Sequence, residues 1–320
     1  MKRQKLISLS LLLAVSMVLS ACGSNDSGEG SSDKPTIKLG YLPITHAVPL
    51  YIEAQMNEEE DQPFNIELVK FPSWPDLMDA LNTGRIDGAS ALVTVAMRAK
   101  EQGIDLKAVA LGHRDGNVLI AANEIDSVQD LVGETFAVPH KFSTHNVLLY
   151  QMLKTEGVAY EDVDVVEMPP AEMPAALSEG RIAGYVVAEP FGAQSVVLET
   201  GKVLYQDNEV WENSVDCALI LHNDFIQDNQ ETAQAFVNSY VEAGNKAELK
   251  DDHVKEISSE YMDVNDEVMD LSFEWISYDD LRIPEDSYEQ LRTYLKEMGL
   301  TDNPPSYEEF VDQTLIDEAM

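Results

Sequence analysis

Residues 80–88 read ALNTGRIDG, and residues 176–184 repeat the pattern as ALSEGRIAG. A second stretch, THAVPLY at residues 45–51, returns as THNVLLY at residues 144–150. The two offsets, 96 and 99 residues, are nearly equal. Two independent segments, each repeated at almost the same spacing, indicate an internal repeat. We therefore predict two lobes of similar topology. Each has a strand, a Thr-His turn, a helix, a second strand, a helix ending at glycine, and a third strand.

The segments around these repeats indicate the fold class. Short apolar runs predict buried strands, and stretches with apolar residues at helical spacing separate them. Strands that alternate with helices imply largely parallel sheets with helices on their faces, so the predicted class is α/β. The expected strands are 37–42, 66–71, 107–110, 135–138 and 163–168, and two of the expected helices are 76–82 and 147–155.

A Thr-His pair follows a strand and opens a helix in each predicted lobe. The pairs are Thr45-His46 and Thr144-His145. Threonine is a frequent helix N-cap, and Pro49 falls in a first turn, where its missing N–H costs nothing. Ligands of open α/β sheets lie beyond the carboxyl ends of the strands, against helix N-termini. One pair alone is more simply a cap and a packing residue, but two equivalent pairs favour a ligand site in a cleft between the lobes.

Five further side chains are candidates for the lining of this cleft. Ser90 and Glu189 lie on the strands that follow the repeated glycine motif, and Glu189 is alternatively a hinge or cap carboxylate. Trp74 follows a strand in a turn, where it is either a packing residue or an aromatic wall. Lys141 and Ser143 precede the second Thr-His pair, and Lys141 with a helix N-terminus could form a local anion site.

The N-terminal residues have the features of an export signal. Basic residues precede an apolar stretch at residues 6–19, which is shorter than the ~20 residues that a membrane-spanning helix needs. Cys22 follows Leu-Ser-Ala, the lipobox pattern of bacterial lipoproteins; an ordinary signal peptide is the alternative. The next residues are polar and rich in Gly and Ser, as in a flexible tether. We predict a signal peptide over 1–21 and a tether over 22–33, with lipid attached to Cys22.

Composition excludes several kinds of partner and site. The chain has 21 basic and 58 acidic residues, and a net charge of −37 repels nucleic acid and anionic lipid surfaces. If Cys22 carries lipid, Cys217 has no disulfide partner, and its apolar neighbours predict a small buried residue rather than a reactive thiol. The six histidines are dispersed, and no nucleophile, phosphate-binding or metal-binding motif occurs. We therefore predict no catalytic residue, no cofactor and no metal ligand.

Five segments resemble the nitrate/sulfonate/taurine group of ABC-importer binding proteins, which includes relatives that bind bicarbonate and pyrimidine precursors of thiamine. The likeness covers residues 38–225 and continues more loosely to the C-terminus. The segments are GYLPITHAVPLYIE (40–53), LMDALNTGRIDGAS (77–90), FAVPHKFSTHNVLLYQML (136–153), VVEMPPAEMPAAL (165–177) and AGYVVAEPFGA (183–193).

The resemblance implies a bilobal periplasmic-binding-protein fold of type II, with a ligand cleft between the lobes and two crossovers. The crossovers are expected near residues 116–122 and 214–222. Lobe one would comprise 34–117 and 222–320, and lobe two 118–221.

The resemblance also implies a function. An extracytoplasmic, monomeric lipoprotein, held at the membrane by its lipid alone, would bind a small polar nutrient and deliver it to a permease and its ATPase. His145 matches a histidine that contacts the anion in nitrate-binding members, and Trp74 matches a tryptophan of that pocket. The chain departs from those members at Ser90, where they have Gln, and at Asp216 and Cys217, where they have Lys.

These departures and the net charge favour a sulfonate-like, taurine-like or pyrimidine-like ligand over nitrate or bicarbonate. Two alternatives to an importer component remain. One is a stand-alone lipoprotein sensor or adhesin. The other is a pyrimidine-biosynthesis enzyme of the same fold, against which the export signal argues.

Overall fold

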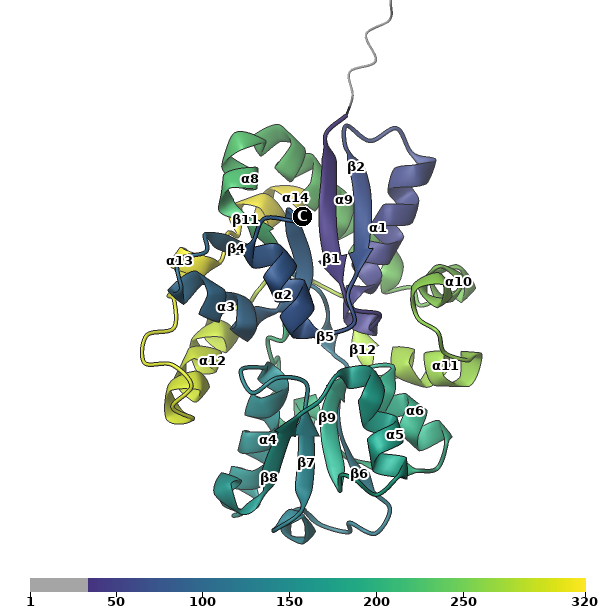
Figure 1. The fold of residues 1–320 in the computed structure, drawn as a ribbon. Coiled ribbons are helices and arrows are strands. Elements are labelled where there is room, and N and C mark those ends of the chain that lie inside the picture. The colour runs from purple at the N-terminus through teal and green to yellow at the C-terminus, as the bar shows by residue number, and fades with distance from the viewer. Residues whose placement is uncertain (1–33) are drawn as a thin grey trace, which may run out of the picture. The chain divides into compact units, whose positions relative to one another are not determined.

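The computed structural model describes residues 34–320, and these form two α/β lobes, each with a five-stranded sheet (Figure 1). The first sheet lies in the upper half of the figure and the second in the lower half. The predicted signal peptide, the tether and Cys22 lie outside the described residues. Within residues 34–320, no helix combines the length and apolar character that a membrane span needs.

The first sheet has the strand order β2-β1-β3-β11-β4. β1 pairs in parallel with β2 and β3, whereas β11 runs antiparallel between β3 and β4. All five residues of β3 are buried, as expected for a central strand of a sheet covered on both faces. The strands are β1 (Thr36–Tyr41), β2 (Asn65–Lys70), β3 (Gly88–Leu92), β4 (Leu106–Leu111) and β11 (Cys217–His222).

The second sheet repeats this topology. Its order is β8-β7-β9-β6-β10, with β7 parallel to β8 and β9, and β6 antiparallel between β9 and β10. The strands β7, β8 and β9 thus correspond to β1, β2 and β3. This confirms the two α/β lobes that the repeated sequence segments predicted. The strands are β6 (Asn117–Ala122), β7 (Thr135–Val138), β8 (Asp164–Glu167), β9 (Gly184–Ala188) and β10 (Gly201–Gln206).

The glycines of the repeated motif have two structural roles. Gly84 and Gly180 follow the ends of helices α2 (Trp74–Asn82) and α5 (Met173–Ser178) with φ of +67° and +66°, the left-handed conformation in which glycine commonly ends a helix. Gly88 and Gly184 begin β3 and β9. A Cβ on Gly88 would lie 2.6 Å from a backbone oxygen of β11, and one on Gly184 would lie 2.7 Å from a backbone oxygen of β6. The motif therefore sets both the turn and the close approach of the next strand.

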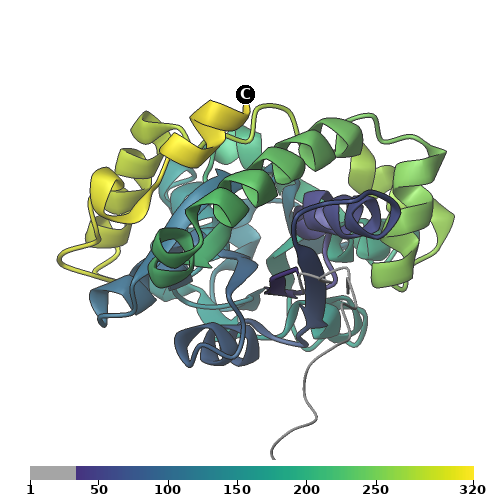
Figure 2. The ribbon, with the colours of Figure 1, turned by 90° about the horizontal axis from the view of Figure 1, so that it is seen from above.

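Helices connect the strands and cover the sheets. In the first lobe, α2 packs on β1 and β3, and α3 packs on β3, β4 and β11. In Figure 2, the long helix α9 runs across the molecule, and it packs on α1 and on the C-terminal α14. The α-helices of the first half are α1 (Val48–Glu59), α2 (Trp74–Asn82), α3 (Val93–Glu101), α4 (Thr144–Thr155), α5 (Met173–Ser178), α6 (Phe191–Val197) and α7 (Asp207–Val210). The remaining ones are α8 (Asn223–Asp228), α9 (Gln230–Ala247), α10 (Asp252–Tyr261), α11 (Asp266–Glu274), α12 (Glu285–Glu297), α13 (Tyr307–Phe310) and α14 (Thr314–Ala319).

The chain passes between the sheets twice, and one predicted boundary differs from the structure. β6, which begins at Asn117, belongs to the second sheet, so the first passage lies next to the predicted boundary. The prediction assigned residues 118–221 to the second lobe, but β11 pairs with β3 and β4 in the first sheet. The second passage therefore comes before Cys217. The apolar sequence of β11 fits either sheet, and only the strand pairing decides between them.

The C-terminal segment also reaches the second lobe. α11 packs on α6, and α12 packs on α4. Lys154 of α4 lies 2.9 Å from Glu297 of α12, and the indole N–H of Trp211 donates to Gln290 of the same helix at 3.0 Å. A two-stranded ribbon of β5 (Arg114–Asp115) and β12 (Ile276–Ser277) joins this segment to the first passage. The lobes are therefore connected by packed helices as well as by the two passages.

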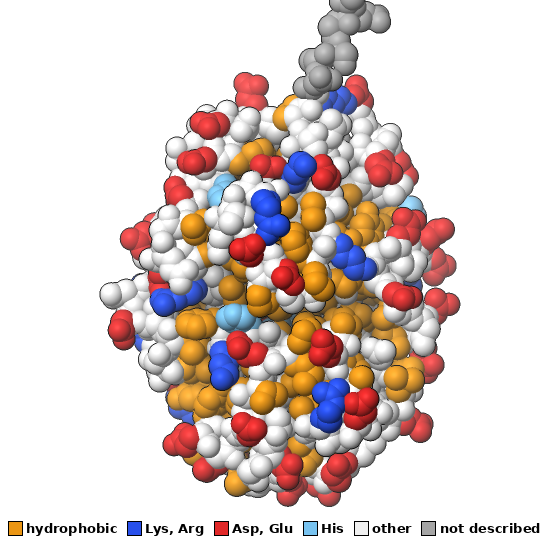
Figure 3. Space-filling view, viewed as in Figure 1, with side chains coloured by type: hydrophobic (Ala, Val, Ile, Leu, Met, Phe, Trp, Pro, Cys, Tyr) orange, Lys and Arg blue, Asp and Glu red, His pale blue; other side chains and the backbone are white. Residues whose placement is uncertain are grey.

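The surface is strongly acidic. Figure 3 shows acidic side chains spread over the visible face, with fewer basic ones between them. The acidic residues are spread along the sequence, and on the visible face they are not gathered in one patch.

Candidate functional site

Three histidines and one aspartate meet where the two lobes face each other. His46 lies in the single-turn 3-10 helix η1 (Thr45–Ala47) after β1, His113 follows β4, and Asp216 directly precedes β11. These three belong to the first lobe, whereas His145 lies in the first turn of α4 in the second lobe. All four are buried, with exposed fractions of 0–3%.

The carboxylate of Asp216 lies at the centre of this cluster. One of its oxygens, Oδ2, is 3.2 Å from Nδ1 of His46 and 3.8 Å from Nε2 of His113. The other, Oδ1, is 3.6 Å from Nδ1 of His145. The rings of His46 and His113 are stacked with centroids 3.4 Å apart, and the ring of His145 lies parallel to that of His46 at 6.3 Å. Residues from both lobes thus converge on one carboxylate.

In two of the histidines, the ring nitrogen that faces away from Asp216 lies near a backbone carbonyl oxygen. Nε2 of His46 is 3.2 Å from the carbonyl oxygen of Gly116, and Nδ1 of His113 is 2.6 Å from that of Asp115. Because a carbonyl oxygen only accepts, these two nitrogens carry the hydrogens. In the neutral form of each ring, the opposite nitrogen, which faces Asp216, has a free lone pair. Histidines that bind metals are oriented in this way by a hydrogen bond from the second ring nitrogen.

Several polar atoms of the cluster lack hydrogen-bond partners. They are Nδ1 of His46, Nε2 of His113, both ring nitrogens of His145 and Oδ1 of Asp216. Most buried polar atoms in proteins are paired, and an unpaired one costs about 1–3 kcal/mol. So many unpaired atoms in one place indicate that a bound species completes the site.

The protonation states of these side chains favour a positively charged ligand. Burial lowers the pKa of His145 to about 4 and holds the pKa of His113 well below its usual range. Burial acts to raise the pKa of Asp216, but the nearby His145 and His46 outweigh it and hold this pKa below the ordinary value. At neutral pH, Asp216 is therefore a carboxylate, and His113 and His145 are neutral donors of lone pairs.

Cys217 lies beside this cluster. Its Sγ is 3.8 Å from Oδ2 of Asp216, and the side chain is buried, as its apolar neighbours predicted. Burial raises the pKa of the thiol well above its usual value. One potential ligand atom from each of His46, His113, Asp216 and Cys217 lies within 4.8 Å of the other three. The prediction of no metal ligand rested on sequence spacing, whereas the fold brings these dispersed residues together.

The two predicted threonines contact the opposite lobe. The hydroxyl of Thr45 donates to the carbonyl oxygen of Glu189 at 3.2 Å, and that of Thr144 donates to the carbonyl oxygen of Val215 at 2.9 Å. Capping, which was the alternative to a ligand site, does not apply, because neither threonine occupies an N-cap position. Ser143 is the N-cap of α4 and accepts from the N–H of the third helical residue. The paired threonines therefore connect the lobes rather than start the helices.

Two further predicted residues are buried but are not part of the cluster. The hydroxyl of Ser90 lies 3.5 Å from the carbonyl oxygen of His46. Glu189 is fully buried, and its Oε2 accepts from the N–H of Ala193 and from the hydroxyl of Ser272 in α11. Burial raises the pKa of Glu189 to about 8. Glu189 thus takes the cap or hinge role that was its alternative interpretation.

The remaining two candidates line other cavities. Trp74 and His140, from different lobes, line a cavity of about 240 Å³ that also includes Glu167. Lys141 lines a separate cavity of about 370 Å³ beside α4. The structure thus groups His46 and His145 of the predicted set, and it adds His113, Asp216 and Cys217. No local motif marks these three, although Asp216 and Cys217 stood out as departures from the nitrate-binding pattern.

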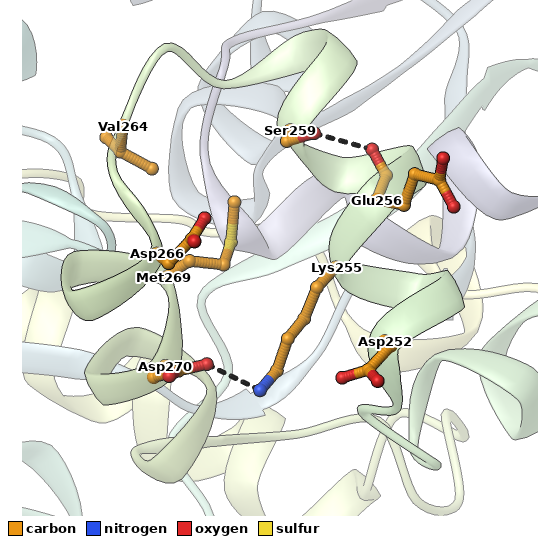
Figure 4. Close-up of a pocket in the computed structure, with 8 residues that line it drawn as sticks. All are labelled: Asp252, Lys255, Glu256, Ser259, Val264, Asp266, Met269 and Asp270. Carbon is orange, nitrogen blue, oxygen red and sulfur yellow. Dashed lines mark hydrogen bonds and ion pairs between the residues drawn. The ribbon is translucent and has the colours of Figure 1, made fainter.

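A pocket between α10 and α11 is a weaker candidate (Figure 4). It has a volume of about 340 Å³, and Figure 4 shows Lys255 extending across it to pair with Asp270. Of its eight lining residues, Met269 alone is buried, and none contributes a buried polar atom without a partner. Its acidic side chains are therefore part of the solvated surface.

Comparison with known proteins agrees with the fold. A ligand-binding component of an ABC-type import system from Staphylococcus aureus, solved with zinc bound, superimposes with a TM-score of 0.85. It is 40% identical, and the match covers 89% of this chain and 99% of that one. A periplasmic nitrate-binding protein from Synechocystis has a TM-score of 0.79 at 20% identity, over 90% of this chain and 88% of that one. The bilobal periplasmic-binding-protein fold is thereby confirmed.

Sequence comparison leads to the same group of proteins. A nitrate import ATP-binding protein of Synechocystis is 25% identical over 252 residues, which is 72% of this chain but 37% of that protein. The chain thus spans little more than a third of this curated relative's length. The model of the NMT1-like family matches residues 30–260. This match, together with the 40% identity to the staphylococcal import component, confirms the predicted resemblance: the chain is a member of the NMT1-like family.

Proposed function

We propose that this protein is the substrate-binding component of an ABC-type importer and that its cargo is a divalent transition-metal ion such as Zn²⁺. The ion would be held by His46, His113, His145 and Asp216. One observation carries the proposal: three buried histidines surround one buried carboxylate between the lobes, and a nitrogen of each ring lies within 3.8 Å of Asp216 without a hydrogen-bond partner.

The chemistry of the ligand set fits zinc. Zn²⁺ is usually four-coordinate and prefers imidazole nitrogen, thiolate sulfur and carboxylate oxygen. Bonds of about 2.0–2.2 Å in a tetrahedron place neighbouring ligand atoms about 3.3–3.6 Å apart. Oδ2 of Asp216 lies 3.2 Å from His46 and 3.8 Å from His113, close to this spacing, whereas His145 lies 3.6 Å from the other oxygen, Oδ1. Ca²⁺ and Mg²⁺ prefer oxygen ligands instead. The zinc bound to the staphylococcal relative adds support.

An anionic cargo fits this site less well. Nitrate, bicarbonate or a sulfonate would meet the lone pairs of neutral imidazoles and the negative charge of Asp216 in a buried space. Such contacts are repulsive, and burial leaves little water to screen them. The sulfonate-like or pyrimidine-like cargo favoured by the sequence is therefore replaced by a cation in this proposal.

The position of the site between the lobes fits delivery by lobe closure. His145 comes from the second lobe, whereas the other three ligands come from the first. A metal ion would gain its fourth ligand when the lobes are closed, so it would bind that state more tightly and shift the population toward it. A permease that recognises the closed form and its ATPase are the proposed partners. The proposed role is binding rather than catalysis.

The first test compares metal ions with small polar molecules as ligands. Protein stripped with a chelator, offered Zn²⁺, Co²⁺, Mn²⁺ and Mg²⁺ in equal amounts and then desalted, is expected to retain about one zinc per chain. Elemental analysis measures this ratio. A thermal-shift series with nitrate, bicarbonate, taurine and an aminopyrimidine provides the comparison. Stabilisation by one of these molecules, without retention of a metal, would contradict the metal cargo.

We also propose that the protein is anchored by lipid on the extracytoplasmic face of the membrane. The support is the Leu-Ser-Ala-Cys22 pattern after a short apolar stretch, followed by a polar tether. Cys22→Ala is expected to move the protein from the membrane fraction to the soluble extracytoplasmic fraction, as measured by fractionation and immunoblotting. Cys217→Ala is the matched control and should stay in the membrane fraction. Equal membrane recovery of both variants is the result that rejects the anchor.

A further inference from the structure

The first lobe carries four potential metal ligands by itself. His46, His113, Asp216 and Cys217 all belong to this lobe, and one ligand atom of each lies within 4.8 Å of the others. His145 is supplied by the second lobe. Five candidate ligands thus serve a metal that usually takes four. The site therefore has one ligand more than it needs when the lobes are closed, and a full set when they are apart.

We infer that Cys217 is a metal ligand of the open protein and that His145 replaces it when the lobes close. This inference rests on the proposed metal cargo. In the open state, the first lobe captures the ion with His46, His113, Asp216 and Cys217. In the closed state, the ion is held by the same two histidines, Asp216 and His145.

Backbone contacts within the first lobe place its candidate ligands side by side. Cys217 begins β11, where it pairs with Leu92 of β3, so a central strand fixes its backbone. The N–H of Gly112 donates to the carbonyl oxygen of Cys217 at 2.9 Å, and this bond places the next residue, His113, beside it. A Cβ on Gly112 would lie 2.6 Å from the carbonyl oxygen of His46, so the two segments are in close contact. The four ligands are thus presented by paired strands and their adjoining turns.

The exchange is balanced in bonds and protons. On capture, the sulfur of Cys217 bonds to the metal and its proton passes to water. On closure, the metal–sulfur bond breaks as a metal–nitrogen bond to His145 forms, and the sulfur takes a proton from water. No electron is transferred. His145 is well placed for this step, because its Nδ1 already lies 3.6 Å from Oδ1 of Asp216 and neither of its ring nitrogens has another partner.

Cobalt spectroscopy tests the exchange. The full chain is used with Cys22→Ser, which leaves Cys217 as its sole thiol because the sequence has two cysteines. Co²⁺ bound to thiolate gives a sulfur-to-cobalt charge-transfer band in the near ultraviolet, whereas nitrogen and oxygen ligands do not. The band is expected in His145→Leu saturated with Co²⁺, and it should be absent when His145 is present. His145→Ala serves as a second variant in case leucine packs poorly, and circular dichroism checks that each variant folds.

Cys217→Ser is the matched control in both backgrounds. It should remove the band from His145→Leu and lower Co²⁺ affinity there by at least the roughly tenfold that even outer-shell losses cause. X-ray absorption on the zinc forms adds a second measure, since Zn–S bonds of about 2.3 Å differ from Zn–N bonds of about 2.0–2.1 Å.

Each result has a distinct meaning. One Co²⁺ per chain without the band in His145→Leu would show that Cys217 is not a ligand. The band in both proteins would make Cys217 a permanent ligand and reject the exchange. Failure of both proteins to retain Co²⁺ would instead reject the proposed metal cargo.

Discussion

Asp216→Asn is expected to lower the affinity for Zn²⁺ by more than the roughly 10–100-fold that typically follows loss of an outer-shell partner. The reason is that Asp216 supplies the negative charge at the centre of the cluster and lies within 3.8 Å of all three histidines. Asparagine keeps the size of the side chain but leaves neutral ligands around a doubly charged ion. Titration against a chromophoric zinc chelator measures the change.

Asp207→Asn is the matched control for this variant. Asp207 is as deeply buried as Asp216, but it accepts hydrogen bonds from the backbone and side-chain amides of Asn117 and lies outside the cluster. Its replacement should leave zinc affinity unchanged. The assignment of the site is contradicted if Asp216→Asn binds zinc like the parent protein, or if both variants lose affinity to the same extent.

The metal-free protein is expected to lose folding stability as the pH rises from about 6.5 to about 8. Burial raises the pKa of Glu189 and of Asp207 to about 8 each, whereas such groups titrate near 4 in an unfolded chain. In this window the folded protein keeps protons that the unfolded chain has lost, so the free energy of unfolding falls with pH. Each group contributes up to about 1.4 kcal/mol per pH unit.

The buried histidines set the lower limit of this window. Burial lowers the pKa of His113 and His145, so below about pH 6.5 the unfolded chain takes up protons that the folded protein does not. Their contribution to the free energy of unfolding therefore rises with pH up to about 6.5 and opposes that of the carboxyl groups. This opposing contribution fades as the histidines of the unfolded chain lose their protons above that pH, and the decline that remains comes from buried carboxyl groups: Glu189, Asp207 and also Glu53, whose pKa burial raises.

Glu189→Gln tests this prediction. Glutamine resembles the protonated carboxyl group in size and cannot ionise, so the decline above pH 6.5 should become less steep. Urea unfolding at several pH values, with a chelator present, measures the free energy of unfolding. Glu134→Gln, which removes one exposed carboxylate, is the control and should keep the slope of the parent protein. Equal slopes in Glu189→Gln and the parent would mean that Glu189 is ionised in the folded state.

The repeated topology could be predicted because its signals are local. The five strands that were given ranges were each placed to within one or two residues, as for residues 37–42 and β1 at Thr36–Tyr41. The repeated glycines marked the ends of α2 and α5 and the starts of β3 and β9. The placement of β11 was missed because an apolar segment does not specify the sheet in which it pairs.

The candidate site was predicted only in part. His46 and His145 were found because the repeat gives them equivalent positions at the starts of two helices. His113 and Asp216 follow or precede strands in segments that have no counterpart in the repeat. The spacing of the histidines also argued against a metal site, since metal motifs are recognised when their ligands lie close together in sequence. The ligand set comes instead from four separate segments.

The sequence by itself determined the α/β class, the two similar lobes, the acidic surface and two residues of the site. These properties follow from side-chain periodicity, turn chemistry and composition, which act over a few residues or over the whole chain. The tertiary structure alone decided that Asp216 lies at the centre of three histidines, that backbone carbonyls turn two of their lone pairs inward, and that His145 reaches the cluster from the other lobe. Those features depend on which strands pair and on how the lobes meet, because distant segments become neighbours only when the sheets form.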